Sequence, residues 1–270
     1  MSALADALGP YLGFSRVGFV NILAFRLRYF TGIVTYALNV TVYYFIWSAV
    51  FRGGQSIAGY NLAQMITYIS VGWIIRSFYT NTIDQEMAYE MIEGSIAMNL
   101  IKPVSVQWMW ISRAIGESAF RLTLLTLPTA VLISFIFRVQ APASRADFLL
   151  FLLAVLGSFF LMGAINFMIG TCAVPLKSIL ALIRAKFWLI ELLSGLLIPM
   201  SYFPGSVRTV LAWLPFEHIA YTPLQIYLGK LDRAAAWRAL GTQWAWVIAL
   251  LLLGNLWWGY ASRRITVHGG

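Results

Sequence analysis

The chain has 270 residues, of which 60% are hydrophobic and only 11% are charged, and its mean hydropathy is +0.78. This composition excludes an ordinary water-soluble globular domain and indicates an integral membrane protein. The formal net charge is +9, but the basic residues are dispersed and form no continuous basic face, which argues against nucleic acid binding. The excess charge is explained by membrane topology and by contact with anionic membrane lipids.

Six segments are apolar enough to cross the hydrocarbon core of a bilayer, for which a helix needs roughly 20 residues. In chain order they are residues 31–51, 62–79, 120–137, 148–174, 179–200 and 244–261. The fifth is the weakest by composition, because its first half carries two basic residues and its second half carries Glu191. No internal repeat or linker divides the chain. We therefore predict an all-α polytopic fold, with residues 1–270 forming one transmembrane domain of about six transmembrane helices.

The distribution of basic residues predicts the orientation. If the N-terminus is cytosolic, 11 of the 19 lysines and arginines fall in inner segments and 7 in outer segments, while Arg76 lies within the second span. By the positive-inside rule this bias places both termini in the cytosol of a multi-pass protein of the cell inner or plasma membrane. Residues 1–30 would be a cytosolic or interfacial segment. Its helical wheel is only weakly amphipathic, because Arg16 and Arg26 oppose Asn21 and Arg28.

Four of the ten acidic residues fall within residues 84–93, in the predicted cytosolic loop 81–105 that follows the second span. On a helix, Glu86, Glu90 and Glu93 would line one face, and Met87 and Met91 would line an adjacent apolar face. Thr82 or Asp84 can cap its start and Gly94 can end it. We interpret this helix as a docking surface for a groove with a basic rim in a partner. The alternative is a solvated loop with helix-favouring acids.

The charged residues after this loop are spaced for pairing along a helix. The Lys102-Pro103 pair ends any preceding helix, because proline lacks an amide hydrogen. The chain then re-enters the membrane, with Arg113, Glu117 and Arg121 spaced four residues apart. Glu117 can therefore pair with either arginine. Structural pairing at the membrane edge and gating of a pathway both remain open.

Ionisable residues inside membrane spans are costly and often functional. We therefore take Arg76, Arg184, Lys186 and Glu191 as candidates for a polar route, although Lys186 and Glu191 can also simply pair with each other. On the outer side, residues 201–243 are broken by prolines into short apolar pieces that can enter the membrane partway. Two residues between these pieces can contact substrate or set an outer gate, unless they form a capped turn with a satisfied histidine: Glu217 and His218.

The loop after the second span carries a family resemblance. Residues 93–105 read E-G-S-I-A-M-N-L-I-K-P-V-S. They resemble the signature of type-2 ATP-binding-cassette permeases, in a group of uncharacterised six-span permeases, and most of the chain is similar in layout. The resemblance implies half of a dimeric membrane unit driven by separate cytosolic ATPases. It also implies that the helix within residues 84–102 is a coupling helix in a cleft of the ATPase, and that residues 201–243 hold short re-entrant outer helices.

Motifs for catalysis are missing from the sequence. The only Gly-Lys pair, Gly229-Lys230, is followed by Leu231 and cannot form a phosphate-binding loop. The topology separates His218 from His268, so no metal site is expected. The lone Cys172 excludes an internal disulfide. We expect a permease that is not an enzyme and has no cofactor of its own, with ATP and magnesium bound to the partner ATPase.

The sequence thus predicts a permease subunit of an ATP-binding-cassette exporter, since no feature indicates capture by an external binding protein. Its expected partners are ATPase subunits, membrane lipids, and a second permease copy or a related permease. The alternative function is an ion-coupled secondary transporter in which Glu117 or Glu191 binds and releases protons.

Overall fold

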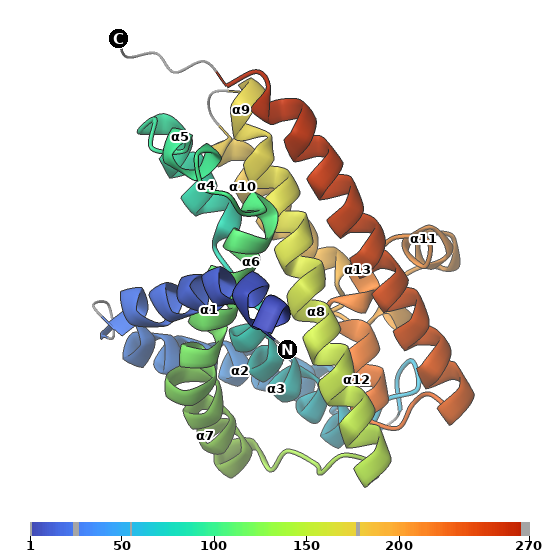
Figure 1. The fold of residues 1–270 in the computed structure, drawn as a ribbon. Helices are drawn as coiled ribbons and strands as arrows, with labels where there is room; N and C mark the ends of the chain where they lie inside the picture. The colour runs from blue at the N-terminus through green and yellow to red at the C-terminus, as the bar shows by residue number, and fades with distance from the viewer. Residues whose placement is uncertain (1, 24–26, 55, 177–178, 266–270) are drawn as a thin grey trace.

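A computed structural model of the protein describes residues 2–23, 27–54, 56–176 and 179–265. These residues form helices joined by short connections and contain no strand, which confirms the all-α prediction (Figure 1). The α-helices are α1 (Ser2–Leu23), α2 (Leu27–Val50), α3 (Leu62–Tyr79), α4 (Ile83–Ile92), α5 (Ala97–Leu100), α6 (Val106–Arg121), α7 (Leu127–Phe137), α8 (Arg145–Thr171), α9 (Ala173–Leu176), α10 (Leu180–Leu193), α11 (Gly205–Leu211), α12 (Tyr221–Tyr227) and α13 (Arg233–Ser262). A π-helical turn, η1 (Leu122–Thr126), and two 3₁₀ turns, η2 (Met200–Tyr202) and η3 (Phe216–His218), complete the set.

Four of the described helical stretches are long and apolar enough to cross a membrane: Thr31–Val50, Val106–Phe137, Arg145–Leu176 and Arg233–Ser262. They contain the third, fourth and sixth predicted spans, and all but the last residue of the first. The second predicted span is α3. Most of its side chains are buried inside the protein, so they need not be as apolar as side chains that face lipid. The fifth is α10, which has only 14 residues. The long apolar helices show that the chain is a polytopic membrane protein, whereas the count of six spans stays a prediction.

The third span differs from its predicted boundaries. The chain was expected to re-enter the membrane before the predicted span 120–137, and residues 106–119 indeed continue without a break through η1 into α7 as part of the same helical stretch. The π-helical turn has a local cause, because Pro128 has no amide hydrogen to donate to the carbonyl of Leu124. The amide of Leu127 donates instead to the carbonyl of Leu122. The helix therefore absorbs the proline by a wider turn and extends over Val106–Phe137.

The connections predicted to lie outside gather at one end of the molecule. The amide of Ala143 donates to the carbonyl of Tyr227 at 3.1 Å, and the hydroxyl of Tyr227 donates to the carbonyl of Gln140 at 2.9 Å. The Lys230 ammonium likewise donates to Gln64 at 2.9 Å. Figure 1 shows α4, α5, α9 and the end of α13 together at the opposite end. These contacts bring the predicted outer connections together, while the topology itself stays a prediction.

The core is organised around α8, which packs along α13 and also contacts α4 and α12. The closest helix crossing lies elsewhere, between α1 and α6. A Cβ atom added to Gly116 would lie 1.8 Å from the carbonyl oxygen of Ser15, and one added to Gly18 would lie 2.1 Å from that of Arg113. These glycines let the two backbones touch. The first helix is therefore fixed along α6, while Leu12 and Val20 are exposed on its other side.

Candidate functional site

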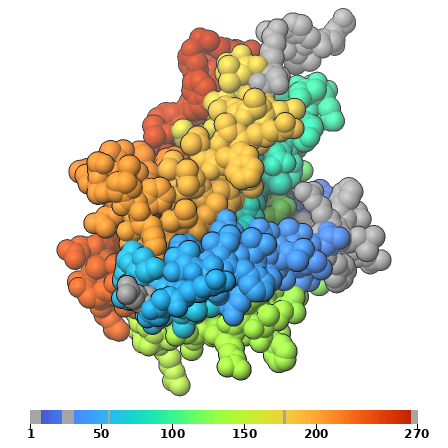
Figure 2. All heavy atoms as spheres, turned by 180° about the vertical axis from the view of Figure 1, so that it is seen from behind, coloured from blue at the N-terminus to red at the C-terminus, as the bar shows by residue number. Residues whose placement is uncertain are grey.

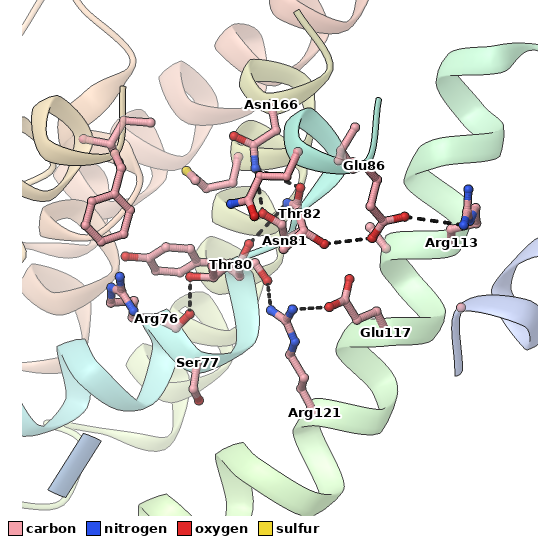
Figure 3. A pocket seen from close by; sticks show the side chains of 18 of the residues that line it. Arg76, Ser77, Thr80, Asn81, Thr82, Glu86, Arg113, Glu117, Arg121 and Asn166 are labelled. Carbon is pink, nitrogen blue, oxygen red and sulfur yellow. Dashed lines mark hydrogen bonds and ion pairs between the residues drawn. The ribbon is translucent and has the colours of Figure 1, made fainter. Parts of the chain in front are cut away.

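A polar cavity of about 520 Å³ lies where α1, α2, α3, α4, α6, α8 and α10 meet. Figure 2 shows the face on which α2 runs across the molecule below α10, and Figure 3 shows the polar side chains of the cavity from close by. The cavity brings together seven of the residues that the sequence suggested for docking or for a polar route: Arg76, Glu86, Arg113, Glu117, Arg121, Lys186 and Glu191. Arg184 does not line this cavity and is exposed on α10.

The first ion pair of the cavity joins α3 to α10. The Arg76 Nε donates to Oε1 of Glu191 at 2.6 Å, and Arg76 Nη1 donates to the hydroxyl of Tyr36 at 3.1 Å. The guanidinium also lies 5.1 Å from the ring centre of Trp73 and 5.6 Å from that of Phe187, within cation–π range. The possible pairing of Glu191 with Lys186 is therefore wrong, since Glu191 is bound by an arginine from another helix.

Lys186 forms a second link, which defines a polar cluster that we call the α4–α10 latch: Asn81, Asp84, Asn166 and Lys186. The Lys186 ammonium lies 2.5 Å from Oδ2 of Asp84 and 2.6 Å from Oδ1 of Asn166. The amide nitrogen of Asn166 donates to the backbone carbonyl and to the side-chain oxygen of Asn81, at 3.0 and 2.9 Å. The cluster joins the start of α4 to α8 and α10 (Figure 3 shows the contact of Asn166 with Asn81).

Sequence reasoning missed three members of this cluster. Asp84 had been considered only as a possible cap for the acidic helix, but the N-cap is Thr82 and has no side-chain capping bond. The Thr82 hydroxyl instead donates to Glu86 at 2.8 Å. Asn166 is a buried amide within the apolar run of α8, and that interruption is the signal that could have identified it, whereas Asn81 lies between two threonines and gives no such signal.

The third and fourth links involve α6. Arg121 pairs with Glu117 and also donates to the backbone carbonyl of Thr80, which decides between the two predicted partners of Glu117 (Figure 3). Arg113 lies 3.4 Å from carboxylate oxygens of both Glu86 and Glu90. Four ion-paired links therefore surround the cavity and connect α3, α4, α6 and α10.

The acidic helix is present as α4, and it ends as predicted at Gly94, whose φ of +75° is a conformation that suits glycine. Its orientation differs from the expected one. Glu86 and Glu90 face α6, and Met87 is 1% exposed and packs against Gly170 of α8. Met91 is half-buried, so the methionine face lies mainly inside the protein.

The solvent-exposed surface of α4, α5 and the residues beside them carries several large apolar side chains. We call it the α4–α5 patch, and its members are Tyr89, Ile92, Met98, Leu100 and Ile101, with exposed fractions between 41% and 73%. Glu93, which is also exposed, lies beside it. Lys102 is half-buried, with its ammonium 2.8 Å from Asn99 and 5.6 Å from the ring centre of Phe14, while Pro103 is exposed.

The outer residues Glu217 and His218 lie apart from the polar cavity. Glu217 lines a second hollow of about 390 Å³ with Arg208, Trp213 and Tyr221. Burial raises the pKa of Glu217, against the opposing effect of Arg208. The neighbouring His218 is buried, and its Nδ1 lies 2.9 Å from the hydroxyl of Thr222. Burial lowers the pKa of His218 to about 4, so its imidazole is neutral near pH 7.

Other predicted features fall outside the described part of the chain or are not found within it. His268, Arg26 and Lys177 lie outside the described residues. Within the described ranges, no group of three or more histidine, cysteine, aspartate or glutamate side chains is placed to hold a metal ion.

Comparison with known protein families shows to which family the chain belongs. The family model described as "ABC-2 family transporter protein" matches residues 37–269, which extend from α2 to beyond the end of α13. The chain belongs to this family. This ABC-2 protein is therefore a membrane permease of an ABC transporter, a transport component that is not itself catalytic, as the resemblance of residues 93–105 implied. No curated protein matches the chain.

Proposed function

We propose that this ABC-2 permease is the membrane-spanning half of an exporter, that it forms the substrate pathway with a second permease copy or a related permease, and that separate cytosolic ATPases drive it through α4 and α5. ATP and magnesium would bind to those ATPases. The observation that carries the proposal is the α4–α5 patch, an exposed apolar surface at the end of the molecule that the charge bias assigns to the cytosol.

An apolar surface in contact with water is energetically unfavourable, and contiguous patches of this kind are typical of interaction sites. The α4–α5 patch differs from the apolar outer faces of the long helices, because it lies on a connection between spans and not on a span. Lipid therefore does not cover it in the proposed topology. Exposed Glu93 at its edge adds a charge that a basic rim on the ATPase would complement.

The packing of α4 supports a mechanical role. A Cβ atom on Gly170 would lie 2.7 Å from the sulfur of Met87 and 3.2 Å from the backbone of Asp84, so α4 and α8 are in close contact. Arg113 ties α4 to α6 through Glu86 and Glu90. Because closely packed interiors transmit displacement, closure of the ATPases would move α4 and tilt the spans around the polar cavity between inward-open and outward-open states.

The docking surface is tested with the natural complex. The chain is purified from its native membrane, and the proteins that accompany it are identified by mass spectrometry. The Ile92→Asp/Ile101→Asp variant should lose at least tenfold of the accompanying ATPase, because it places charge in the patch. The matched Ile92→Met/Ile101→Met variant, which keeps the patch apolar, should retain the ATPase. Normal ATPase recovery with the aspartate variant would contradict the docking surface.

The ion-coupled alternative is not favoured. Family membership assigns the chain to ABC transport, and both candidate carboxylates are engaged with arginines, Glu117 with Arg121 and Glu191 with Arg76. A proton-coupled carrier needs a carboxylate that is alternately free and protonated. Substrate movement in proteoliposomes that hold this permease without any ATPase, and that responds to a proton gradient, would restore the alternative.

A further inference from the structure

We propose that Lys186 is a positioning residue that makes α10 move together with α4, so that displacement of the docking region is passed to the helix that closes one side of the polar cavity. The inference rests on the proposed function, because it assigns the route by which ATPase movement reaches the cavity. It concerns the α4–α10 latch and not the docking patch.

The attachment of α10 to the rest of the protein is limited. Among the residues described for this helix only Ile183, Ile190 and Glu191 are buried, whereas Trp188 is 69% and Leu189 is 54% exposed. Near its start, α10 contributes to a small apolar cluster that is separate from the main core. The members of this cluster come from α4, from α9 and from the start of α10: Ala88, Ala173, Ile179 and Ile183.

The same junction holds the ion pair of Lys186 with Asp84. Asp84 is completely buried, in the first turn of α4, and its Oδ1 has no hydrogen-bond partner among the described residues. Its carboxylate therefore depends on Lys186 for compensation of its charge. If α10 moved away from α4, a buried carboxylate would be left without its counter-ion, which is strongly unfavourable. The two helices are thus constrained to move as a unit.

Asn166 gives this unit a fixed point on α8. Its side-chain oxygen accepts from Lys186 and its side-chain nitrogen donates to Asn81, so one amide connects the lysine to the segment that joins α3 to α4. Further along α10, Glu191 is bound by Arg76 of α3. A displacement of α4 therefore acts on α10 at its first half, while its second half is held at α3. That difference favours a tilt of α10 over a translation.

The experiment separates docking from coupling. ATPase recovery on purification reports docking, and the ATP-induced change in distance between spin labels on Leu189→Cys of α10 and Trp237→Cys of α13, in a Cys172→Ser background, reports coupling. Lys186→Met should keep docking within twofold of wild type and lower coupling at least tenfold. Lys186→Arg, which keeps the charge, should recover most of the coupling. Lys230→Met is the matched control, since it removes a lysine that joins two segments at the opposite end, and it should change coupling less than twofold.

A distance measurement tests directly whether α4 and α10 move together. With Cys172→Ser as background, spin labels on Gln85→Cys and Leu189→Cys report the separation of α4 and α10, because both positions are exposed and neither belongs to the α4–α5 patch. In wild type this distance should stay constant on ATP binding, and in Lys186→Met it should change. If Lys186→Met fails to accumulate, the Asp84→Asn/Lys186→Met pair removes the link without leaving a buried charge, and the same results are expected.

The outcomes differ for the two proposals. Normal coupling with normal docking in Lys186→Met, or a constant α4–α10 distance in that variant, would overturn the role of the latch and leave the proposed function intact. An unmutated permease that recovers no ATPase would instead overturn the proposed function. Equal loss of coupling in Lys186→Met and Lys230→Met would reduce the effect to general destabilisation and would also overturn the latch.

Discussion

Lys186 and Glu191 lie five residues apart on α10, yet each binds a partner on a different helix. Positions five apart on an α-helix point in directions about 140° apart, so they cannot share a face. This simple geometry excludes the pair that their opposite charges suggested. Spacing in sequence could identify the Glu117–Arg121 pair, which is four apart, but it could not identify contacts such as Arg76–Glu191, because these depend on how separate helices pack.

At the residue scale, the Arg76–Glu191 pair leads to a prediction about stability. Both side chains are only slightly exposed, so removing one partner leaves a poorly solvated charge. We expect Glu191→Met to lower the free energy of unfolding by about 3–5 kcal/mol. The Arg76→Met/Glu191→Met pair should be clearly less destabilised, because no unpaired charge remains. Thermal unfolding of the purified variants checks this order. A double variant less stable than the single one would show that the pair does not compensate its own charges.

At the element scale, predictions from composition located the helices well and their ends less well. The uncharged runs of α2, α8 and α13 were recognised, because an apolar stretch of sufficient length has few alternatives to a membrane helix. The π-helical turn that lets α6 continue into α7 could not be predicted from the apolar run 120–137, because a proline such as Pro128 normally indicates a break in a helix. The orientation of α4 was also missed, because acid and methionine faces look equally suited to a partner or to the protein interior.

The crossing of α1 and α6 gives an element-scale prediction. Gly116→Ala should separate the two helices and lower stability by about 1–3 kcal/mol, because its Cβ would overlap the backbone of α1. Gly13→Ala is the matched control on α1. Nothing lies within 4 Å of its added Cβ, so the better helix propensity of alanine should leave stability unchanged or slightly raised. Thermal unfolding of both variants provides the comparison, and equal behaviour would disprove the close crossing.

At the scale of the whole molecule, the connections that the predicted topology assigns to the outer side lie together. The outer loops contact one another through Ala143, Tyr227 and Lys230, although they are far apart in sequence. Sequence alone could assign these loops to one side, because the sides alternate after each span. It could not reveal that the charged residues of four helices, α3, α4, α6 and α10, converge on one cavity, since that depends on the angles between helices.

Topology can be tested by labelling from the two sides of the membrane. With Cys172→Ser as background, Glu93→Cys reports the α4–α5 region and Ser206→Cys reports α11, and both positions are exposed. In intact cells a membrane-impermeant maleimide should modify only Ser206→Cys. In inverted vesicles it should modify only Glu93→Cys. Labelling of Glu93→Cys in intact cells would place the proposed docking region on the wrong side.

The α4–α5 patch also has a consequence for production of the chain without the proposed ATPase partner. A subunit synthesised in excess would present Ile92, Met98 and Ile101 to the surrounding water with nothing to cover them. Such a surface favours self-association and recognition by quality-control proteases. Production of the permease together with the proposed partner ATPase should therefore yield more intact protein than production of the permease alone.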